Sequence, residues 1–311
     1  MFSRVSECDI PFFFNTLRRY PSLGALVRFV QLDDESAGET TAFLQHLDLL
    51  PNVKRLYNLI WAIESDKKPQ PPRRDRRPCL TGLQLSALDP EFYFATLGEY
   101  FDLAGLTALA VKCAPTSFGY DGWSDVSLFE EMPSSLVSLA VEDLYEDSLP
   151  FLLDVVKRFT VLEELRLSLN EVNVAEVNLL AVLPSLQLLT VQHGFNLAGL
   201  LVGLGEGHCA LVKLSIVATA SEDDVFDDWD DEQTTDVEEE HELYRFAIAV
   251  ASARSSGLLP SLRHIRIDRA EEAIDWSRRA DMPGLQAMAR MLCDVGLVVE
   301  DARGQIWQHG W

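Results

Sequence analysis

Apolar residues recur along the chain in a six-residue pattern with leucine, valine or isoleucine at the first, fourth and sixth positions. The best-formed copy is LEELRL at 162–167, which is followed by Asn170. Clean copies begin at Leu80, Leu106, Leu136, Leu162, Leu186, Leu211 and Leu262, and looser copies begin at Leu23 and Val53. From Leu23 onward, successive copies start 30, 27, 26, 30, 26, 24, 25 and 51 residues apart. Seven clean copies at this spacing indicate an internal repeat, because only a lone copy could be dismissed as chance in a leucine-rich chain.

Each copy is predicted to form a short strand, because alternation puts its fourth and sixth side chains on one face of the sheet. The rest of each period must bring the chain back to the start of the neighbouring strand. A strand with its return segment needs roughly 20–29 residues, close to the observed spacing. Helical stripes or capping signals occur in five return segments, at 89–101, 150–159, 174–183, 242–253 and 283–296.

The pattern L-x-x-L-x-L-x-x-N at 162–170 resembles the leucine-rich-repeat family, and the resemblance spans about residues 20–300. It implies an α/β solenoid, or horseshoe, of about nine irregular repeats, with a parallel β-sheet on the concave face and helices on the convex face. The irregular repeats are similar to those of fungal F-box/leucine-rich-repeat proteins. The stretch at 14–32 also resembles the segment that follows an F-box, but no F-box is recognisable in the chain.

Three parts are expected from these signals. Residues 1–20 are predicted to form an N-terminal helical cap, and residues 21–300 the leucine-rich-repeat solenoid. Residues 297–311 are predicted to form a C-terminal cap, with a strand at 298–300 and a turn at 302–304. An end repeat has no neighbour to cover its apolar face, so Trp307 and Trp311 are candidates for that cover.

A basic, proline-rich loop at 64–79 interrupts the repeat. Its centre, KKPQPPRRDRRP, has six basic residues, one aspartate and four prolines. Proline prevents a helix, so the loop is predicted to be extended and solvated. A nuclear-import patch, a site for an acidic partner and an insertion without dedicated function are all open readings.

An acidic insertion at 219–242 accounts for the double interval of 51 residues. Residues 221–242 hold 13 Asp or Glu and no Lys or Arg. Like charges at this density repel one another, so the insertion is predicted to be disordered. It lacks the spacing of a calcium-binding loop. Its candidate partner-binding residues are Asp227, Asp228, Trp229, Asp230 and Asp231.

Charge and composition limit the function classes. The 311-residue chain carries a net charge of −23, and the remainder outside the acidic segment carries −23 + 13 = −10, which argues against nucleic-acid binding. The five cysteines form no CxxC pair, which argues against a disulfide framework or a zinc knuckle. No apolar run of about 18 residues occurs, so no membrane span is expected, and cytoplasm or nucleus is the predicted location.

Motifs for catalysis or metal binding are absent from the sequence. The six histidines show no ligand spacing, and neither GxSxG nor GxxxxGK[ST] occurs. Gly203, Gly205 and Gly207 are predicted to form a turn between repeats, because no lysine follows them and no helix is entered there. The sequence therefore predicts a protein without catalytic activity, metal site or cofactor.

A binding surface is expected at the third, fifth and seventh positions of the copies, which point away from the core. The candidate partner-binding residues there are Lys112, Glu142, Glu164, Arg166, Gln192, Lys213, His264 and Arg266. Their mixed charge suits a protein ligand better than a nucleic-acid backbone. One predicted function is a protein-interaction module, such as the substrate-recognition part of an F-box-like ubiquitin-ligase adaptor. The other is an autonomous scaffold or regulator that binds a basic partner through loop 221–242.

Overall fold

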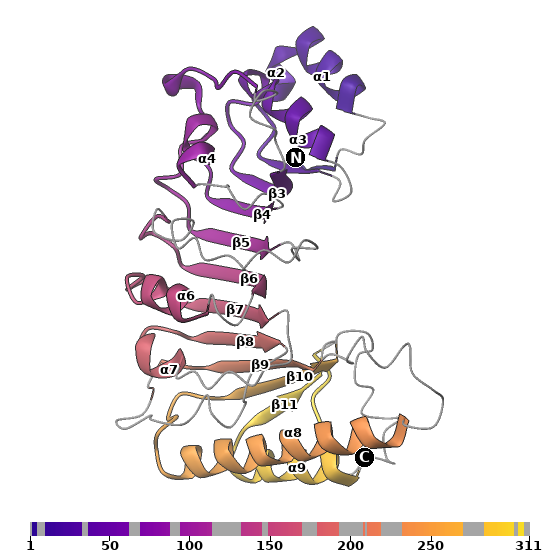
Figure 1. Cartoon of the computed structure of the whole chain (residues 1–311), viewed down its shortest axis with the longest axis vertical. Helices are drawn as coiled ribbons and strands as arrows, with labels where there is room; N and C mark the ends of the chain where they lie inside the picture. Colours follow the sequence, from indigo (N-terminus) through magenta and orange to yellow (C-terminus); the bar gives the residue numbers. More distant parts are fainter. Residues whose placement is uncertain are drawn as a thin grey trace. The chain divides into compact units, whose positions relative to one another are not determined.

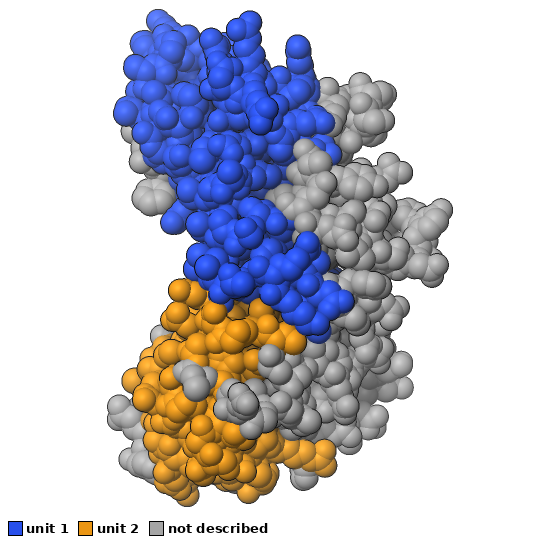
Figure 2. All heavy atoms as spheres, turned by 90° about the vertical axis from the view of Figure 1, so that its left-hand side faces the viewer, with its two compact units in different colours: residues 1–162 blue, residues 163–311 orange. Residues whose placement is uncertain are grey.

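The chain divides into two compact units, Met1–Leu162 and Glu163–Trp311, which are coloured separately in Figure 2. The computed structural model describes residues 2–4, 10–32, 37–61, 69–87, 94–113, 132–144, 149–169, 179–192, 208, 210–218, 232–269, 283–301 and 304–307. Each unit is built on parallel strands that are joined by helices or turns, so the fold is α/β (Figure 1). Asp227, Asp228, Trp229, Asp230, Asp231, Trp311 and the three glycines at 203–207 lie outside the described residues.

In the described part of unit 1, strands follow one another in chain order and every pair is parallel. The strands are β1 (Phe2–Arg4), β2 (Phe29–Gln31), β3 (Arg55–Trp61), β4 (Gly82–Ala87), β5 (Ala108–Cys113) and β6 (Ser138–Leu144). The helices are α1 (Ile10–Arg19), α2 (Pro21–Gly24), α3 (Ala37–Leu44), α4 (Phe94–Tyr100) and α6 (Leu149–Val156), with short 3₁₀ turns η1 (Leu47–Leu49) and η3 (Arg74–Arg76).

Unit 2 continues the same plan. Its described strands are β7 (Glu164–Leu169), β8 (Leu188–Gln192), β9 (Lys213–Ala218), β10 (His264–Arg269) and β11 (Val298–Glu300). Its helices are α7 (Leu179–Val182), α8 (Glu232–Ser255) and α9 (Pro283–Asp294), of which α8 and α9 run side by side (Figure 1). Consecutive strands are neighbours and parallel, an open-sheet arrangement compatible with a solenoid.

The core is made by the predicted apolar positions. In unit 2 the fourth position of every copy falls in one register column, and each of its side chains is at most 1% exposed. The members of this column are Leu165, Leu189, Leu214, Ile265 and Val299. Leu162 and Leu167 of the best-formed copy are buried as well. The prediction that the first, fourth and sixth positions face the core is therefore confirmed for that copy.

A shared backbone hydrogen bond joins neighbouring copies within each unit at the second position. The carbonyl of Glu163 accepts from the N–H groups of Gln187 and Leu188, at 2.8 and 2.9 Å. The carbonyl of Gln187 accepts in the same way from Val212 and Lys213, at 2.8 and 3.0 Å. Unit 1 repeats the arrangement at the carbonyls of Arg28, Lys54, Thr81 and Thr107. Arg28 is the second position of a copy that begins at Val27, so the predicted start at Leu23, an exposed residue of α2, is wrong. Because one contact recurs at equivalent positions, the copies are structural repeats as well as sequence repeats.

The loose copy at Val53 contains a β-bulge. The pairing of β3 with β4 shifts between Leu56 and Leu59, and Asn58 between them has a φ of 59°. Asparagine tolerates this left-handed conformation better than most residues, and the Asn58 side-chain amide donates to the carbonyl of Leu32 at 3.2 Å. The extra residue explains why Leu59, and not residue 58, takes the buried place of the sixth position.

Three local predictions are corrected by the structure. The predicted disorder of 219–242 is wrong for residues 232–242, because α8 begins at Glu232. Glutamate is a good helix former, and acidic charge near a helix N-terminus is favourable. The N-terminal cap at 1–20 contains a strand, β1, beside its helix α1, because β1 pairs with β2. Ser168, predicted to point outward, is only 3% exposed.

The C-terminal segment folds back on the last strand. Strand β11 occupies the predicted residues, and Ile306 forms an antiparallel bridge with Glu300. The Trp307 N–H donates to the Val299 carbonyl at 2.8 Å, and the Trp307 side chain is buried. Trp307 thus closes the core beside the last strand.

The basic loop is anchored to helix α4 at both of its described ends. The Tyr100 hydroxyl donates to the Pro69 carbonyl at 2.5 Å, and Arg77 Nη1 donates to the Gly98 carbonyl at 2.6 Å. The Asp102 N–H also donates to the Pro78 carbonyl at 2.9 Å. The prediction of a solvated loop holds for its middle, where 73–76 are exposed, but the prediction of an extended loop is wrong at 74–76, which form the turn η3.

The Tyr100 phenol is expected to ionise only at strongly alkaline pH. Burial, with a smaller effect from the charge of Glu99, raises the pKa of Tyr100 to about 12 from its ordinary value of 10.0. Because the folded pKa lies above the unfolded one, this contribution to stability is complete below pH 10 and is lost as the pH rises through 12. Absorbance titration of phenolate should show a late transition that disappears in Tyr100→Phe; a Tyr100 signal near pH 10 would contradict this.

Candidate functional site

Two columns of side chains cross the sheet of unit 2, at the third and fifth positions of its copies. We call these ten residues the unit-2 polar face. The third-position column is Glu164, Leu188, Lys213, His264 and Val298, and the fifth-position column is Arg166, Thr190, Ser215, Arg266 and Glu300. All ten side chains are exposed or half-buried, whereas the residues that alternate with them in the fourth-position column are buried. The polar face is therefore a continuous surface in register across five strands.

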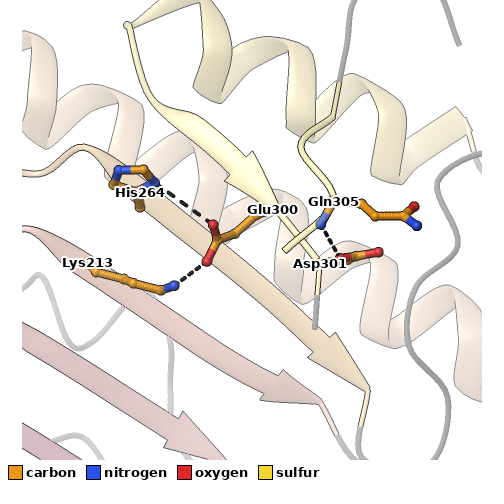
Figure 3. A network of polar contacts seen from close by, with 5 residues as sticks. All are labelled: Lys213, His264, Glu300, Asp301 and Gln305. Atoms are coloured by element: carbon orange, nitrogen blue, oxygen red, sulfur yellow. Dashed lines mark hydrogen bonds and ion pairs between the residues drawn. The ribbon is translucent and has the colours of Figure 1, made fainter. Parts of the chain in front are cut away.

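A three-residue network lies at the β11 end of this face (Figure 3). Glu300 accepts a hydrogen bond from Lys213 through Oε1, and its Oε2 lies 4.0 Å from His264 Nδ1. Lys213 reaches Glu300 across the intervening strand β10, on which His264 stands. The Glu300 side chain is only 14% exposed, against 28% for Lys213 and 42% for His264. The carboxylate thus holds Lys213 by an ion pair and lies near His264, a second candidate binding residue.

Glu300 belongs to none of the predicted copies, because its segment breaks the apolar pattern. Counted by register with the copy at Leu262, its first position is Gly296 and its sixth is Asp301, a fully buried carboxylate where the clean copies have leucine, valine or isoleucine. Asp301 Oδ1 accepts from the Gln305 N–H at 2.7 Å, which fixes the turn after β11 (Figure 3). The pairing of β10 with β11 identifies Glu300 as a residue of this face, because Glu300 is the register partner of Arg266. A search restricted to apolar residues at the sixth position could not find it.

The candidate residues of unit 1 form a separate set. Lys112 on β5 and Glu142 on β6 are register partners, and Lys112 Nζ lies 3.8 Å from Asp143 Oδ2. Asp143 has a φ of 58°, an uncommon conformation for a residue other than glycine. The remaining candidates belong to unit 2. Gln192 ends strand β8 opposite Ser168 and Val217, but its side chain lies outside the described part of the chain.

The charges of the unit-2 polar face are mixed. Arg166, Lys213 and Arg266 are positive and Glu164 and Glu300 are negative, so the face carries 3 − 2 = +1 with histidine neutral. The whole chain carries −23. A polar face of balanced charge inside a strongly acidic chain favours a ligand that presents both signs of charge, as protein surfaces do, over a polyanion.

His208 has a structural position. The ring is buried between turns, with Nε2 2.7 Å from the Leu183 carbonyl and Nδ1 accepting from the Leu211 N–H at 3.1 Å. Because Nδ1 accepts, the proton of the neutral ring is on Nε2, which donates to Leu183. Both ring nitrogens are occupied by backbone groups, which makes His208 a link between turns and not a ligand-binding group.

Neither a protein-family model nor a curated protein matches the chain. Within the described ranges, no group of three or more His, Cys, Asp or Glu side chains could hold a metal ion. The helices described here are all too short or too polar to cross a membrane. The class that the fold defines is a repeat-like α/β protein with parallel strands in chain order.

Glu300→Gln is expected to lower the free energy of unfolding by about 1–2 kcal/mol, because Lys213 is mostly buried and would lose its counter-charge. Denaturant unfolding of Glu300→Gln, Lys213→Met and the double variant would measure the coupling, which we expect to be about 1 kcal/mol. Purely additive effects of the two substitutions would show that the ion pair contributes nothing.

Proposed function

We propose that the chain is a leucine-rich-repeat protein that binds a protein partner, without catalysis, on the concave face of its sheet. The repeat spacing, the buried leucine columns and the recurring second-position hydrogen bond support the family and the horseshoe. In such a solenoid the helices lie on the convex face and the outward strand positions line the concave one.

The unit-2 polar face is the observation that carries this proposal. Register holds its ten side chains in two columns, and Glu300 fixes Lys213 beside His264. Polar groups that are already ordered lose little conformational entropy when a ligand binds them. The mixed charge and the exposed Leu188 supply both polar and apolar contacts, the combination that protein interfaces use.

The partner of this face would be a substrate protein if the chain works as the substrate-recognition part of an F-box-like ubiquitin-ligase adaptor, the role that the sequence resemblance implies. A second candidate function is a scaffold or regulator that holds a basic partner through the acidic segment 221–242. The start of α8 at Glu232 supports this second function, because the acidic residues after Glu232 then belong to a helix with an ordered backbone.

Affinity purification of the full chain with a blocked face tests the proposal. Thr190→Arg with Ser215→Arg adds two bulky charges to half-buried positions of the unit-2 polar face. Ser252→Arg with Ser256→Arg adds the same groups at exposed positions at the end of α8, and so serves as the matched control. We expect partner recovery to fall at least about 10-fold with the first pair and to change less than about 2-fold with the second.

Deletion of 221–231, combined with Gln or Asn at the six acidic positions of 232–242, separates the two candidate functions. The proposed face predicts that this combined variant leaves partner recovery unchanged. Loss of the same partner in this variant, with binding that weakens steeply as salt rises, would favour the acidic-segment function instead. Equal recovery with the face variant and the wild type would rule out the face.

A further inference from the structure

We propose that the basic loop of unit 1 is a second binding site, which takes a short anionic segment of a partner protein through Arg73, Arg74 and Arg76. These three side chains are exposed within four consecutive residues. The inference does not rest on the unit-2 polar face, because the loop and its anchors all belong to unit 1.

The backbone around the three arginines is held in place. Arg76 N–H donates to the Arg73 carbonyl at 2.8 Å, which closes the single turn η3. Arg73 before the turn and Arg77 after it are extended, with ψ values of 144° and 129°. Exposed cations on a disordered chain would have to be ordered on binding. These cations are presented by a turn in a loop that is already tied to α4 at Pro69 and Arg77.

Arg77 differs in role from its neighbours. Its guanidinium donates to the Gly98 carbonyl, near the end of α4, and its side chain is half-buried. It therefore anchors the loop, whereas Arg73, Arg74 and Arg76 remain for a ligand. Asp75 stands among these three and is also exposed, so the four exposed residues carry 3 − 1 = +2.

Anionic groups are the chemistry that guanidinium recognises best, because its planar fork matches a carboxylate or a phosphate with two parallel hydrogen bonds. A short segment with two or three such groups matches the size of the loop. Nucleic acid fits less well, because three arginines release few counterions and the net charge of −23 repels a long polyanion. We therefore assign the site to a protein segment rich in glutamate, aspartate or phosphoserine.

Fluorescence anisotropy on the full chain tests the site with four probes: a hexaglutamate peptide, a peptide with three phosphoserines, a neutral hexaglutamine peptide and a thymidine oligonucleotide. The loop variant combines Arg73→Ser, Arg74→Ser and Arg76→Ser. Its control combines Arg158→Ser, Arg245→Ser and Arg290→Ser, three exposed arginines elsewhere, so both variants change the net charge equally.

We expect at least one anionic peptide to bind the wild type about 10-fold or more tightly than the loop variant, with less than a 2-fold change in the control. Asp75→Asn should tighten binding about 2–5-fold, because it removes the one opposing charge. The tighter of the two anionic peptides identifies carboxylate or phosphate as the source. Equal affinities of the loop and control variants, absence of binding by both anionic peptides, or tighter loop-dependent binding of the oligonucleotide would each overturn the proposal.

Discussion

Replacement of Leu214 by aspartate is expected to abolish cooperative folding of unit 2, with a loss of more than about 5 kcal/mol in the free energy of unfolding. Leu214 is fully buried at the centre of the fourth-position column, between Leu189 on β8 and Ile265 on β10. A carboxylate at this place would have to be desolvated or protonated, and the packing of the leucine would be lost as well.

The adjacent residue is the matched control for this prediction. Ser215→Asp introduces the same carboxylate one residue further along β9, at a half-buried position of the unit-2 polar face. Because successive strand residues point to opposite faces, we expect it to cost about 0.5 kcal/mol or less. Circular dichroism during urea unfolding measures both variants. Equal destabilisation by the two substitutions would contradict the assigned faces of the sheet.

Among the buried polar residues that the structure describes, His208→Ala is expected to be a highly damaging substitution, with a loss of about 3 kcal/mol in the free energy of unfolding. The His208 ring bonds the backbone at Leu183 and Leu211, and the backbone N–H of His208 donates to the Leu258 carbonyl at 2.6 Å. These three backbone groups belong to the turns that precede β8, β9 and β10. Removal of the ring leaves a buried carbonyl and a buried N–H without their partner and opens a cavity between turns.

Two further variants distinguish the hydrogen bonds of His208 from its volume. Asparagine can place an acceptor near the position of Nδ1, and glutamine can place a donor near the position of Nε2. We therefore expect His208→Asn and His208→Gln each to recover about 1 kcal/mol relative to alanine in denaturant unfolding. If alanine were within about 0.5 kcal/mol of the wild type, the ring would not be linking the turns.

The strands could be predicted from the sequence because their apolar residues recur at a regular spacing and because the burial of these side chains determines which face of each strand points to the core. Leu165 and Leu167 alternate with the charged residues Glu164 and Arg166 along β7, and only one facing of the strand buries both leucines. The bulge at Asn58 was visible only as a loose copy, since the extra residue shifts Leu59 out of the expected spacing. Strand β1 was missed because three residues are too short to show a period.

The parts that failed depend on contacts between distant residues. Ser168 has the polarity of an outward residue, but it is buried. The acidic residues 232–242 were predicted to be disordered from their charge alone, although they continue a helix whose later residues Phe246, Ala247 and Val250 are buried. The anchoring of the basic loop by Tyr100 and Arg77 could not be read from proline content, because both bonds end on backbone carbonyls far along the chain.

Only some of the residues on the unit-2 polar face could be predicted as candidate binding residues, because the sequence pattern shows the alternation along one strand but not the pairing between strands. Lys213, His264 and Arg266 follow from the alternation of clean copies, and the structure places all three on the unit-2 polar face. Glu300, which holds Lys213 by an ion pair, is followed by the buried Asp301, where the clean copies have an apolar residue. Register across the sheet finds such a residue, whereas a search along one strand does not.

Site-specific photo-crosslinking tests the central claim most directly. A photoreactive residue at Thr190 or Ser215 lies on the unit-2 polar face of neighbouring strands, and one at Ser252 or Ser256 lies at the end of α8. Our account predicts that the first two positions capture the same partner protein in the full chain and that the last two capture none of it. Capture of that partner from Ser252 or Ser256, and not from Thr190 or Ser215, would contradict the claim that the sheet face is the binding surface.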